Sequence, residues 1–225
     1  MSKVIIGDAT LYFGDCIKYM ATLPDKAFDL AIVDPPYGMG DECWSGGGVL
    51  GSRKYIKAYR EKQWDNSTPD SFYFEELFRV SKNQIIWGGN YFGLPATRCV
   101  LCWDKEQPMP TLSDWEMAWT SFQSLAKIWR GRSQDPQRIH PTQKPVKLYE
   151  WLLTNYAKPG QRILDTHLGS GSSAIAAEKL GFKFVGCEID ADYFNAACKR
   201  IEQAAAQGKL FAPEPTKQVQ EDLYV

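Results

Sequence analysis

Histidine is scarce in this sequence, and long apolar runs are absent. Among 225 residues there are only two histidines, His140 and His167, and neither an HExxH zinc motif nor a nucleophile triad can be assembled around them. No run approaches the roughly 20 apolar residues that a membrane-spanning helix requires. The first residues also lack the apolar stretch of a secretory signal. We therefore expect a cytoplasmic protein that does not bind membranes.

The six cysteines contain no complete metal-binding set. Only Cys99 and Cys102 have the spacing of a metal-binding pair, and no second pair of cysteines or histidines completes four ligands. Both lie in a strand-like run, in which positions three apart point to opposite faces. The sequence therefore predicts no metal site, and we interpret the thiols as buried structural residues in a reducing compartment.

Strand-like and helix-like segments alternate along the chain. Apolar runs predict strands at 28–33, 84–87, 99–103, 115–119, 162–165 and 183–187, several of them apolar at consecutive positions. Helical periodicity predicts helices at about 15–22, 71–81, 145–157, 172–180 and 191–206. This alternation is typical of an α/β fold with a doubly wound, mainly parallel sheet. We expect one domain over 1–210, irregular segments at about 38–69 and 104–139, and a weakly ordered tail at 211–225.

Opposite charges nearly balance overall but are unevenly distributed. Lys and Arg total 26 against 27 Asp and Glu, which gives a net charge of −1. Residues 53–62 carry +4 and residues 127–147 carry +5, so the rest of the chain carries −10. A uniformly basic nucleic-acid-binding protein is excluded, but a single basic face would suit a polyanion. The alternative is that both basic stretches are solvated loops.

A glycine-rich turn lies between a strand and a helix in the last third of the chain. Asp165 ends the strand, Gly169 and Gly171 lie in the turn, and the helix starts at about Ser172. Such a turn lets a ligand approach the backbone closely at a helix N-terminus. Glu188, at the end of the next strand, is placed to accept ribose hydroxyls. These features indicate a cofactor that contains adenosine. They leave S-adenosylmethionine, NAD and a turn without a ligand open, although the late position of the turn argues against NAD.

The tetrapeptide Asp34-Pro-Pro-Tyr37 follows directly on the apolar strand that ends at Val33. Two prolines stiffen this turn at the carboxyl end of a strand, where α/β sheets bind ligands. An exocyclic amine on adenine or cytosine is a poor nucleophile, because its lone pair is delocalised into the ring. Acceptors such as the Asp34 carboxylate and the Pro35 carbonyl stabilise the positive charge that develops as the amine attacks. Tyr37 adds a flat face on which a base can stack. The alternative is a rigid turn with no chemical role.

Three motifs together resemble a known family. They are Asp34-Pro-Pro-Tyr37, His140-Pro-Thr-Gln-Lys-Pro145 followed by Leu148, and the segment from Asp165 through Gly171 with Glu188. With them the chain resembles the amino-group DNA methyltransferases that use S-adenosylmethionine. The order of the motifs is that of the circularly permuted beta-type class, with the catalytic motif first and the cofactor motif last. The resemblance covers about 14–200, loosely over 38–139, and implies a Rossmann-like sheet of seven strands with a reversed edge hairpin. The activity it implies is methyl transfer to the exocyclic N6 of a flipped-out adenine in double-stranded DNA.

The resemblance also implies roles for individual residues. Asp34 and the Pro35 carbonyl would hold the target amine, and Tyr37 would stack on the flipped base. Glu188 would hold the ribose, while Thr142 and Lys144 would meet the carboxylate end of the cofactor. The complete set implied in cofactor binding is Asp15, Cys16, Asp34, Thr142, Lys144, Asp165, His167, Gly169, Gly171, Ser172 and Glu188.

The two irregular segments are also the basic ones, and they adjoin the motifs. We therefore predict that 41–64 and 105–139 contact DNA phosphates and bases. The basic residues expected there include Arg53, Lys54, Lys57, Arg130, Arg132 and Arg138. Four tryptophans in or near these segments are interpreted either as base-stacking residues or as core residues: Trp64, Trp103, Trp115 and Trp129.

The sequence departs from the family after Asp165, where Thr166, His167 and Leu168 replace a proline and an aromatic residue. His167 is interpreted either as a substitute for the lost ring at the methyl donor or as a partly exposed turn residue. Asp rather than Ser at position 34 favours adenine over cytosine-N4. The alternatives are cytosine-N4 methylation, methylation of RNA or of a protein glutamine amide, a non-catalytic DNA-binding relative, and an NAD oxidoreductase. Either a monomer or a homodimer, in a restriction–modification pair or as a solitary methylase, fits the sequence.

Overall fold

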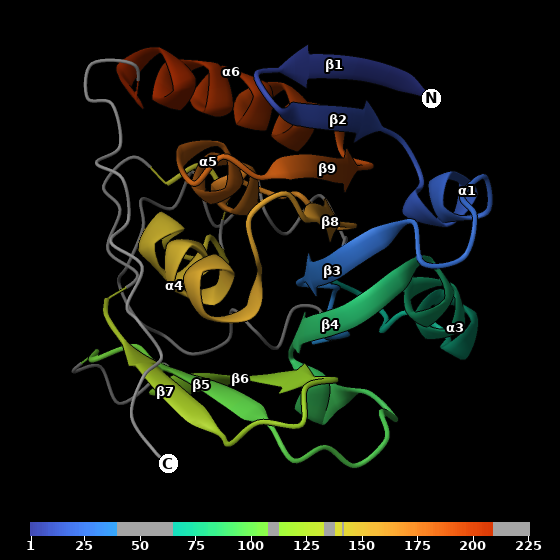
Figure 1. The fold of residues 1–225 in the computed structure, drawn as a ribbon, viewed down its shortest axis with the longest axis vertical. Coiled ribbons are helices and arrows are strands. Elements are labelled where there is room, and N and C mark those ends of the chain that lie inside the picture. Colours follow the sequence, from blue (N-terminus) through green and yellow to red (C-terminus); the bar gives the residue numbers. More distant parts are fainter. Residues whose placement is uncertain (40–64, 108–112, 133–137, 141, 209–225) are drawn as a thin grey trace, which may run out of the picture.

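The computed structural model describes residues 1–39, 65–107, 113–132, 138–140 and 142–208, and a single mixed β-sheet forms its centre. Within these ranges nine strands form the sheet, in the order β1-β2-β9-β8-β3-β4-β6-β5-β7 (Figure 1). The strands are β1 (Ser2–Ile6), β2 (Ala9–Phe13), β3 (Phe28–Val33), β4 (Ser81–Trp87), β5 (Val100–Asp104), β6 (Trp115–Thr120), β7 (Lys127–Arg130), β8 (Arg162–Asp165) and β9 (Lys183–Glu188). The helices are α1 (Cys16–Met20), α3 (Ser71–Val80), α4 (Val146–Tyr156), α5 (Ser172–Lys179) and α6 (Ala191–Gly208), with a 3-10 turn η2 (Gly89–Tyr91).

Five neighbouring strands, β2, β9, β8, β3 and β4, are parallel to one another. Next to them β6 pairs antiparallel with both β4 and β5, and β7 pairs parallel with β5. At the opposite edge β1 pairs antiparallel with β2. The predicted α/β fold with a doubly wound, mainly parallel sheet is confirmed. The permuted order of its motifs stays a prediction.

The expected number of seven strands is wrong for this chain, because β1 and β7 add a strand at each edge of the sheet. Both edge strands are short, and most of their residues are exposed or half-buried. Such strands need no apolar run, which is the signal that predicted β3, β4, β5, β6, β8 and β9 but not β2. β7 also corrects the expectation that 104–139 is irregular. Most of 38–69 and the tail at 211–225 lie outside the described residues.

Alternating side chains of the central strands pack into two hydrophobic cores, one on each face of the sheet. Leu30 and Ile32 of β3 pack into the core beneath α4, α5 and α6. Ala31 and Val33 point to the other face and pack against α1 and α3. Helices on both faces explain why β3 is apolar at consecutive positions. Figure 1 shows α4, α5 and α6 grouped apart from α1 and α3.

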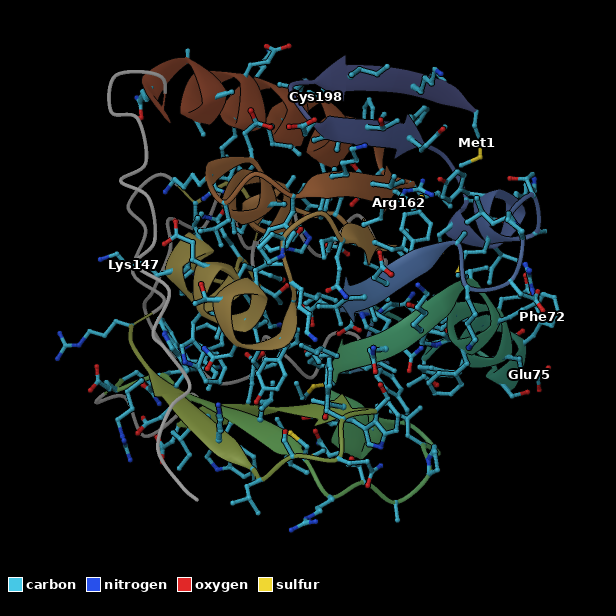
Figure 2. The ribbon with its side chains drawn as sticks, viewed as in Figure 1. Met1, Phe72, Glu75, Lys147, Arg162 and Cys198 are labelled. Carbon is cyan, nitrogen blue, oxygen red and sulfur yellow. The ribbon has the colours of Figure 1, made fainter. Side chains whose placement is uncertain are left out.

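The outer side of α3 faces solvent, and Figure 2 shows Phe72 and Glu75 pointing away from the sheet. Phe72 is 50% exposed, whereas Tyr73 and Leu77 on the inner side are buried. Asp70 caps this helix by accepting the Tyr73 backbone N–H at 3.0 Å. None of the helices in the described ranges combines the length and apolar character needed to cross a membrane.

Strand direction brings the sequence motifs together. The carboxyl ends of parallel strands meet at one edge of a sheet, so Asp34 after β3, Asp165 at the end of β8 and Glu188 at the end of β9 lie along the same edge. Because β6 runs in the opposite direction, its first residues, including Glu116, lie at that edge as well. This edge is where we look for a site.

Candidate functional site

Asp34 follows directly on β3, and two side chains hold its carboxylate. Lys144 Nζ lies 2.6 Å from Asp34 Oδ2, and the Tyr37 hydroxyl donates a hydrogen bond to Asp34 Oδ1 at 2.6 Å. The Lys144 side chain is 2% exposed and the Asp34 side chain 18%. Burial raises the pKa of the Asp34 carboxyl, while the Lys144 ammonium acts to lower it. The carboxylate therefore has a fixed orientation and depends on a buried cation to stay ionised.

Glu116 of β6 is a second carboxylate on the same ammonium group. Its Oε2 lies 3.0 Å from Lys144 Nζ, and its Oε1 lies 2.7 Å from Lys105 Nζ. Burial acts to raise the pKa of Glu116, but the attraction of Lys144 and Lys105 outweighs it and lowers the pKa to about 2. The four side chains form a row of alternating charge, Asp34, Lys144, Glu116 and Lys105. Such a row satisfies each buried charge with an opposite neighbour.

Tyr37 carries an aromatic face that a second tyrosine covers. Its ring packs so closely on Gly88 that a Cβ at that position would clash with it, and Gly88 has a φ of +68°. The Tyr91 ring stacks on the Tyr37 ring, with centroids 4.9 Å apart and planes 17° apart. Tyr91 is 45% exposed. A planar ligand entering from solvent can therefore replace the Tyr91 ring on the face of Tyr37.

Asp65 fixes the turn that carries Tyr37. Its Oδ1 accepts the backbone N–H groups of Tyr37 at 2.6 Å and of Gly38 at 2.9 Å. The hydrogen bonds hold the turn after Pro36 in one conformation, which complements the stiffness that the two prolines give it. The orientation of Tyr37 is thus determined by backbone contacts as well as by its hydroxyl.

The backbone N–H groups of the glycine-rich turn are bonded within the turn, to β9 and to the carboxylates of Asp165 and Glu188. Gly169 and Gly171 have φ values of +51° and +74°. The Gly169 N–H donates to Glu188 Oε2 at 2.8 Å, and the Gly171 and Leu168 N–H groups donate to backbone carbonyls, each at 2.9 Å. The His167 N–H donates to Asp165 Oδ1 at 3.0 Å. Most amides that would face a phosphate in a dinucleotide-binding turn are therefore already used.

The turn is also acidic, which decides the kind of cofactor that fits. Burial raises the pKa of Asp165 to about 7, and burial also raises the pKa of Glu188. Two carboxylates beside a turn with few available N–H groups disfavour the diphosphate of NAD. They suit a cofactor with positively charged groups, because a cation relieves the cost of burying a carboxylate. S-adenosylmethionine, which carries a sulfonium and an ammonium group, fits these residues.

Glu188 retains capacity for a ligand. Its Oε1 accepts the N–H groups of Ile189 and Asp190 at 2.9 Å each, in addition to the Gly169 N–H on Oε2. A carboxylate has about four acceptor positions, so about one is left for a ribose hydroxyl. The Gly14 N–H donates to the Glu188 carbonyl at 2.8 Å, which brings the end of β2 next to this residue.

Asp15 and Cys16 accordingly lie close to the glycine-rich turn. Asp15 caps α1 by accepting the Ile17 N–H at 2.8 Å. Burial, together with the nearby carboxylate of Asp15, raises the pKa of Cys16 to about 12. The thiol is therefore neutral, and we assign it a packing role in the wall of the site.

The segment 138–145 brings Lys144 to Asp34 from more than 100 residues away in the sequence. The backbone N–H of Gln143 donates to the His140 carbonyl at 3.2 Å, and the Gln143 side chain accepts the Ile139 N–H at 3.0 Å. Thr142 Oγ1 lies 3.1 Å from His140 Nδ1. The resemblance implied that Lys144 meets the carboxylate end of the cofactor. In the structure its ammonium group contacts Asp34 and Glu116, and its contact with the cofactor stays a prediction.

His167 belongs to a short chain of polar side chains. Its Nδ1 lies 3.0 Å from Thr166 Oγ1, which lies 2.6 Å from the Tyr73 hydroxyl. The Tyr73 and His167 rings meet edge to face, with centroids 5.4 Å apart. Burial lowers the pKa of His167 to about 4, so its ring is neutral at neutral pH. Ser172, the first residue of α5, is buried and accepts a hydrogen bond from Arg200 at 2.9 Å.

The residues predicted to bind DNA are only partly described. Arg53, Lys54, Lys57 and Trp64 lie outside the described residues. Arg130 and Arg132 lie at the exposed end of β7, where Arg130 pairs with Asp104 at 3.3 Å, and Arg138 is also exposed. Trp103 is buried and Trp129 packs against the same core, whereas Trp115 is 53% exposed. Of the described tryptophans in this region, only Trp115 is open enough to meet a base.

Four residues of the site had no signal in the sequence analysis: Lys105, Glu116, Asp65 and Tyr91. Glu116 lies within one strand-like run, and Lys105 directly follows another. A single charged residue at such a position is ordinarily interpreted as one that faces solvent. Their role depends on the reversal of β6, which sequence periodicity does not reveal. Among the described residues, no cluster of three or more His, Cys, Asp and Glu side chains is arranged to hold a metal ion.

Comparisons with known proteins show which proteins this chain is similar to. Residues 103–199 match the model of the N6_N4_Mtase family, which is described as DNA methylase. The type II methyltransferase M2.LlaDCHI of Lactococcus lactis subsp. cremoris is 24% identical over 256 residues, which cover 89% of this chain and 92% of that protein. The crystal structure of an M1.HpyAVI–SAM complex has a TM-score of 0.53 and 22% identity, covering 85% of this chain and 99% of that one. The cytosine-N4-specific PvuII DNA methyltransferase has a TM-score of 0.56 and 12% identity, covering 89% and 92%.

These matches confirm the resemblance to the amino-group DNA methyltransferases, and the solved structures confirm the fold. One of those structures is a complex with S-adenosylmethionine, the cofactor that the sequence predicts. The family and its relatives include cytosine-N4 enzymes, so the choice of base is a separate question.

Proposed function

We propose that this protein is a site-specific DNA methyltransferase that transfers a methyl group from S-adenosylmethionine to the N6 amino group of an adenine taken out of the DNA helix. The observation that carries the proposal is the position of Asp34. Its buried carboxylate lies at the same edge of the sheet as the acidic turn formed by Asp165 and Glu188. An acceptor for an amine and a pocket for a cationic nucleoside are thereby brought side by side.

Asp34 supplies what an exocyclic amine needs in order to react. Its carboxylate accepts an N–H bond of the target nitrogen, and the Pro35 carbonyl accepts the other. Both acceptors interact more strongly as the nitrogen becomes positive during attack, so they lower the barrier rather than merely bind the base. Asp34 is mostly buried, which strengthens this electrostatic effect.

Tyr37 supplies the surface for the target base. A base inside a duplex is out of reach, so the nucleotide has to be extruded before transfer. The Tyr37 ring is held by its contact with Gly88 and by the hydrogen bond from its hydroxyl to Asp34. The half-exposed ring of Tyr91 stacks on the Tyr37 ring, and the target base replaces it there.

The glycine-rich turn supplies the cofactor site. When bound, S-adenosylmethionine provides a methyl group on a positively charged sulfur. Glu188 binds a ribose hydroxyl, Gly169 lets the nucleoside approach the backbone, and Asp165 offers a carboxylate to the positive charge of the cofactor. Asp15 and Cys16 form the adjacent wall near Glu188.

Adenine is the proposed base, because Asp rather than Ser precedes the two prolines. Double-stranded DNA is the proposed substrate, with Arg130, Arg132 and Arg138 among the phosphate contacts. The exposed position of these residues near the site supports that assignment. The N4 amino group of cytosine presents the same chemistry and is the alternative that the experiment has to separate.

The experiment is to incubate the purified protein with isotope-labelled S-adenosylmethionine and unmethylated DNA, and then to digest the DNA to nucleosides for mass spectrometry. We expect labelled N6-methyladenine. N4-methylcytosine would retain the mechanism and overturn the choice of base. Cofactor binding without any transfer to DNA would overturn the proposal, and parallel reactions with RNA and with protein would then locate the acceptor.

A further inference from the structure

Two carboxylates share one buried ammonium group beside the proposed methyl-transfer site. Lys144 Nζ lies 2.6 Å from Asp34 Oδ2 and 3.0 Å from Glu116 Oε2, and the Lys144 side chain is 2% exposed. The second oxygen of Glu116 lies 2.7 Å from Lys105 Nζ. Lys144 therefore touches both acids at once and can shift between them by a small movement of its side-chain end.

The ammonium group occupies an acceptor that the proposed reaction needs. Asp34 Oδ1 receives the Tyr37 hydroxyl at 2.6 Å, and Oδ2 receives Lys144. A tetrahedral nitrogen with N–H donors, such as an ammonium group, resembles the amine of the target base as it becomes pyramidal and positive. Lys144 thus competes with the target amine for Asp34 Oδ2.

Moving Lys144 away from Asp34 has a cost unless another anion is at hand. A buried cation left without a partner is strongly destabilising. Glu116 removes that cost, because it already contacts Lys144 and its ionised form is held by Lys105. The Trp87 ring lies 5.1 Å from Lys144 Nζ and adds a cation–π contact.

We propose that Lys144 is a positioning residue that occupies the Asp34 carboxylate in the DNA-free enzyme and passes to Glu116 when the target amino group enters. This inference rests on the proposed function. It assigns Glu116 the role of an alternative partner for the displaced cation. Before base entry, Lys144 keeps Asp34 ionised and oriented. After base entry, Asp34 Oδ2 is available to the amine.

The first test is a double-mutant cycle with Glu116→Gln and Lys144→Met, measured at the DNA site that the wild-type enzyme methylates. With no anion to receive Lys144, Glu116→Gln should lower kcat by about tenfold or more at saturating DNA. The dissociation constants for DNA and for cofactor should stay within about twofold of wild type, because the phosphate contacts and the glycine-rich turn are untouched. The matched control is Glu150→Gln on α4. It breaks an exposed ion pair with Lys179 of α5 and should leave kcat unchanged.

The cycle separates a role through Lys144 from a general structural role. If Glu116 acts by receiving Lys144, then Glu116→Gln should cost less than about twofold when Lys144 is already methionine. The fluorescence of 2-aminopurine at the target position, recorded without cofactor, gives a second reading that does not depend on transfer. Glu116→Gln should reduce its change on DNA binding, and Glu150→Gln should not.

The second test is the pH dependence of Lys144→Met. Losing the ammonium removes the group that opposes the effect of burial on Asp34, so the acidic limb of the pH–rate profile should move to higher pH. Glu116 loses the same cation but remains paired with Lys105. The other titratable groups that face Asp34 are the same in both proteins: Tyr37, Asp65, Tyr149 and Asp165. A structural defect alone would lower the rate by one factor at every pH.

A conservative variant keeps the inference testable if Glu116→Gln or Lys144→Met does not fold. Glu116→Asp keeps an anion next to Lys144, so it should retain more of kcat at saturating DNA than Glu116→Gln does. The inference is overturned if Glu116→Asp slows transfer as much as Glu116→Gln does, if the two costs in the cycle simply add, or if Glu116→Gln behaves like Glu150→Gln. Failure of the wild-type enzyme to methylate DNA would instead remove the proposed function on which it rests.

Discussion

At the residue scale, the carboxylates of the site are governed by two opposing effects on their pKa values: burial raises them, and neighbouring cations lower them. Asp34, Glu116 and Asp165 all lose contact with water on folding, but the groups that surround each carboxylate differ. Glu116 is paired with two lysines and has a pKa of about 2. Asp165 accepts hydrogen bonds but has no cation among the partners described, and its pKa is about 7. An acid held without a cation is prepared for a positive ligand, which is how we interpret Asp165.

Asp165 predicts how cofactor binding depends on pH. A positive cofactor lowers the pKa of the carboxyl, so binding is weak where Asp165 is protonated and strengthens as pH rises through about 7. We expect the dissociation constant for S-adenosylmethionine to fall by about tenfold between pH 6 and 8. Isothermal titration calorimetry measures it. Asp165→Asn is the control, because it retains the titration of the cofactor itself. An equally steep dependence in this variant would contradict the role of Asp165.

The stacking of Tyr91 on Tyr37 predicts that removal of the Tyr91 ring raises kcat/KM for DNA. Its ring stacks on Tyr37, where we propose that the target base binds, and such a stack is worth about 0.5–1.5 kcal/mol. Tyr91→Ala should therefore raise kcat/KM for DNA by about two- to tenfold, while Tyr91→Phe, which keeps the ring, should match wild type. Steady-state kinetics on the mapped DNA site provide the comparison. A loss in Tyr91→Ala that Tyr91→Phe restores would make Tyr91 a stacking partner of the base instead.

At the element scale, the reversal of β6 is what completes the site. The parallel strands bring Asp34, Asp165 and Glu188 to one edge, and only a strand of opposite direction can begin there. Sequence patterns predicted β3, β4, β5, β6, β8 and β9 because each is an apolar run. They missed β1, β2 and β7, which pair at or near the edges: β1 and β7 are mostly exposed, and β2 is fully buried at only two of its five positions.

The same limit applies to the site. Asp34, Tyr37 and the glycine-rich turn stand out because Pro-Pro and Gly-x-Gly are rare local signals. Glu116 and Lys105 carry no such signal, since their importance comes from a partner that is distant in the sequence. Lys144 was predicted as a site residue, but its ion pairs with Asp34 and Glu116 join residues that are distant in the sequence and depend on the tertiary fold.

The end of β7 predicts a salt-dependent DNA contact. Arg132 follows this edge strand and is exposed, so Arg132→Ala should weaken DNA binding and reduce the slope of log affinity against log salt by about one. Lys183→Ala is the control, because Lys183 is the first residue of β9 and the site lies at the other end of that strand, next to Glu188. Fluorescence anisotropy at several salt concentrations measures the slope. An unchanged slope in Arg132→Ala would remove this residue from the DNA contacts.

At the scale of the whole molecule, one sheet edge joins three parts of the chain. The first third contributes Asp34 and Tyr37, the middle third contributes Glu116 and Lys144, and the last third contributes Asp165 and Glu188. Lys144 and Asp34 are separated by 110 residues, yet their charged atoms lie 2.6 Å apart. The fold thereby places the Asp34 carboxylate next to the acidic turn of Asp165 and Glu188, and this adjacency is the basis of the proposed methyl transfer.

The most direct test of that claim is the variant Asp34→Ala, assayed for methyl transfer to DNA and for S-adenosylmethionine binding on the same preparation. Because Asp34 acts on the amine and the acidic turn is separate from it, we expect transfer to fall by at least about 100-fold with cofactor affinity within about threefold of wild type. Transfer that remains within about tenfold of wild type would contradict the account.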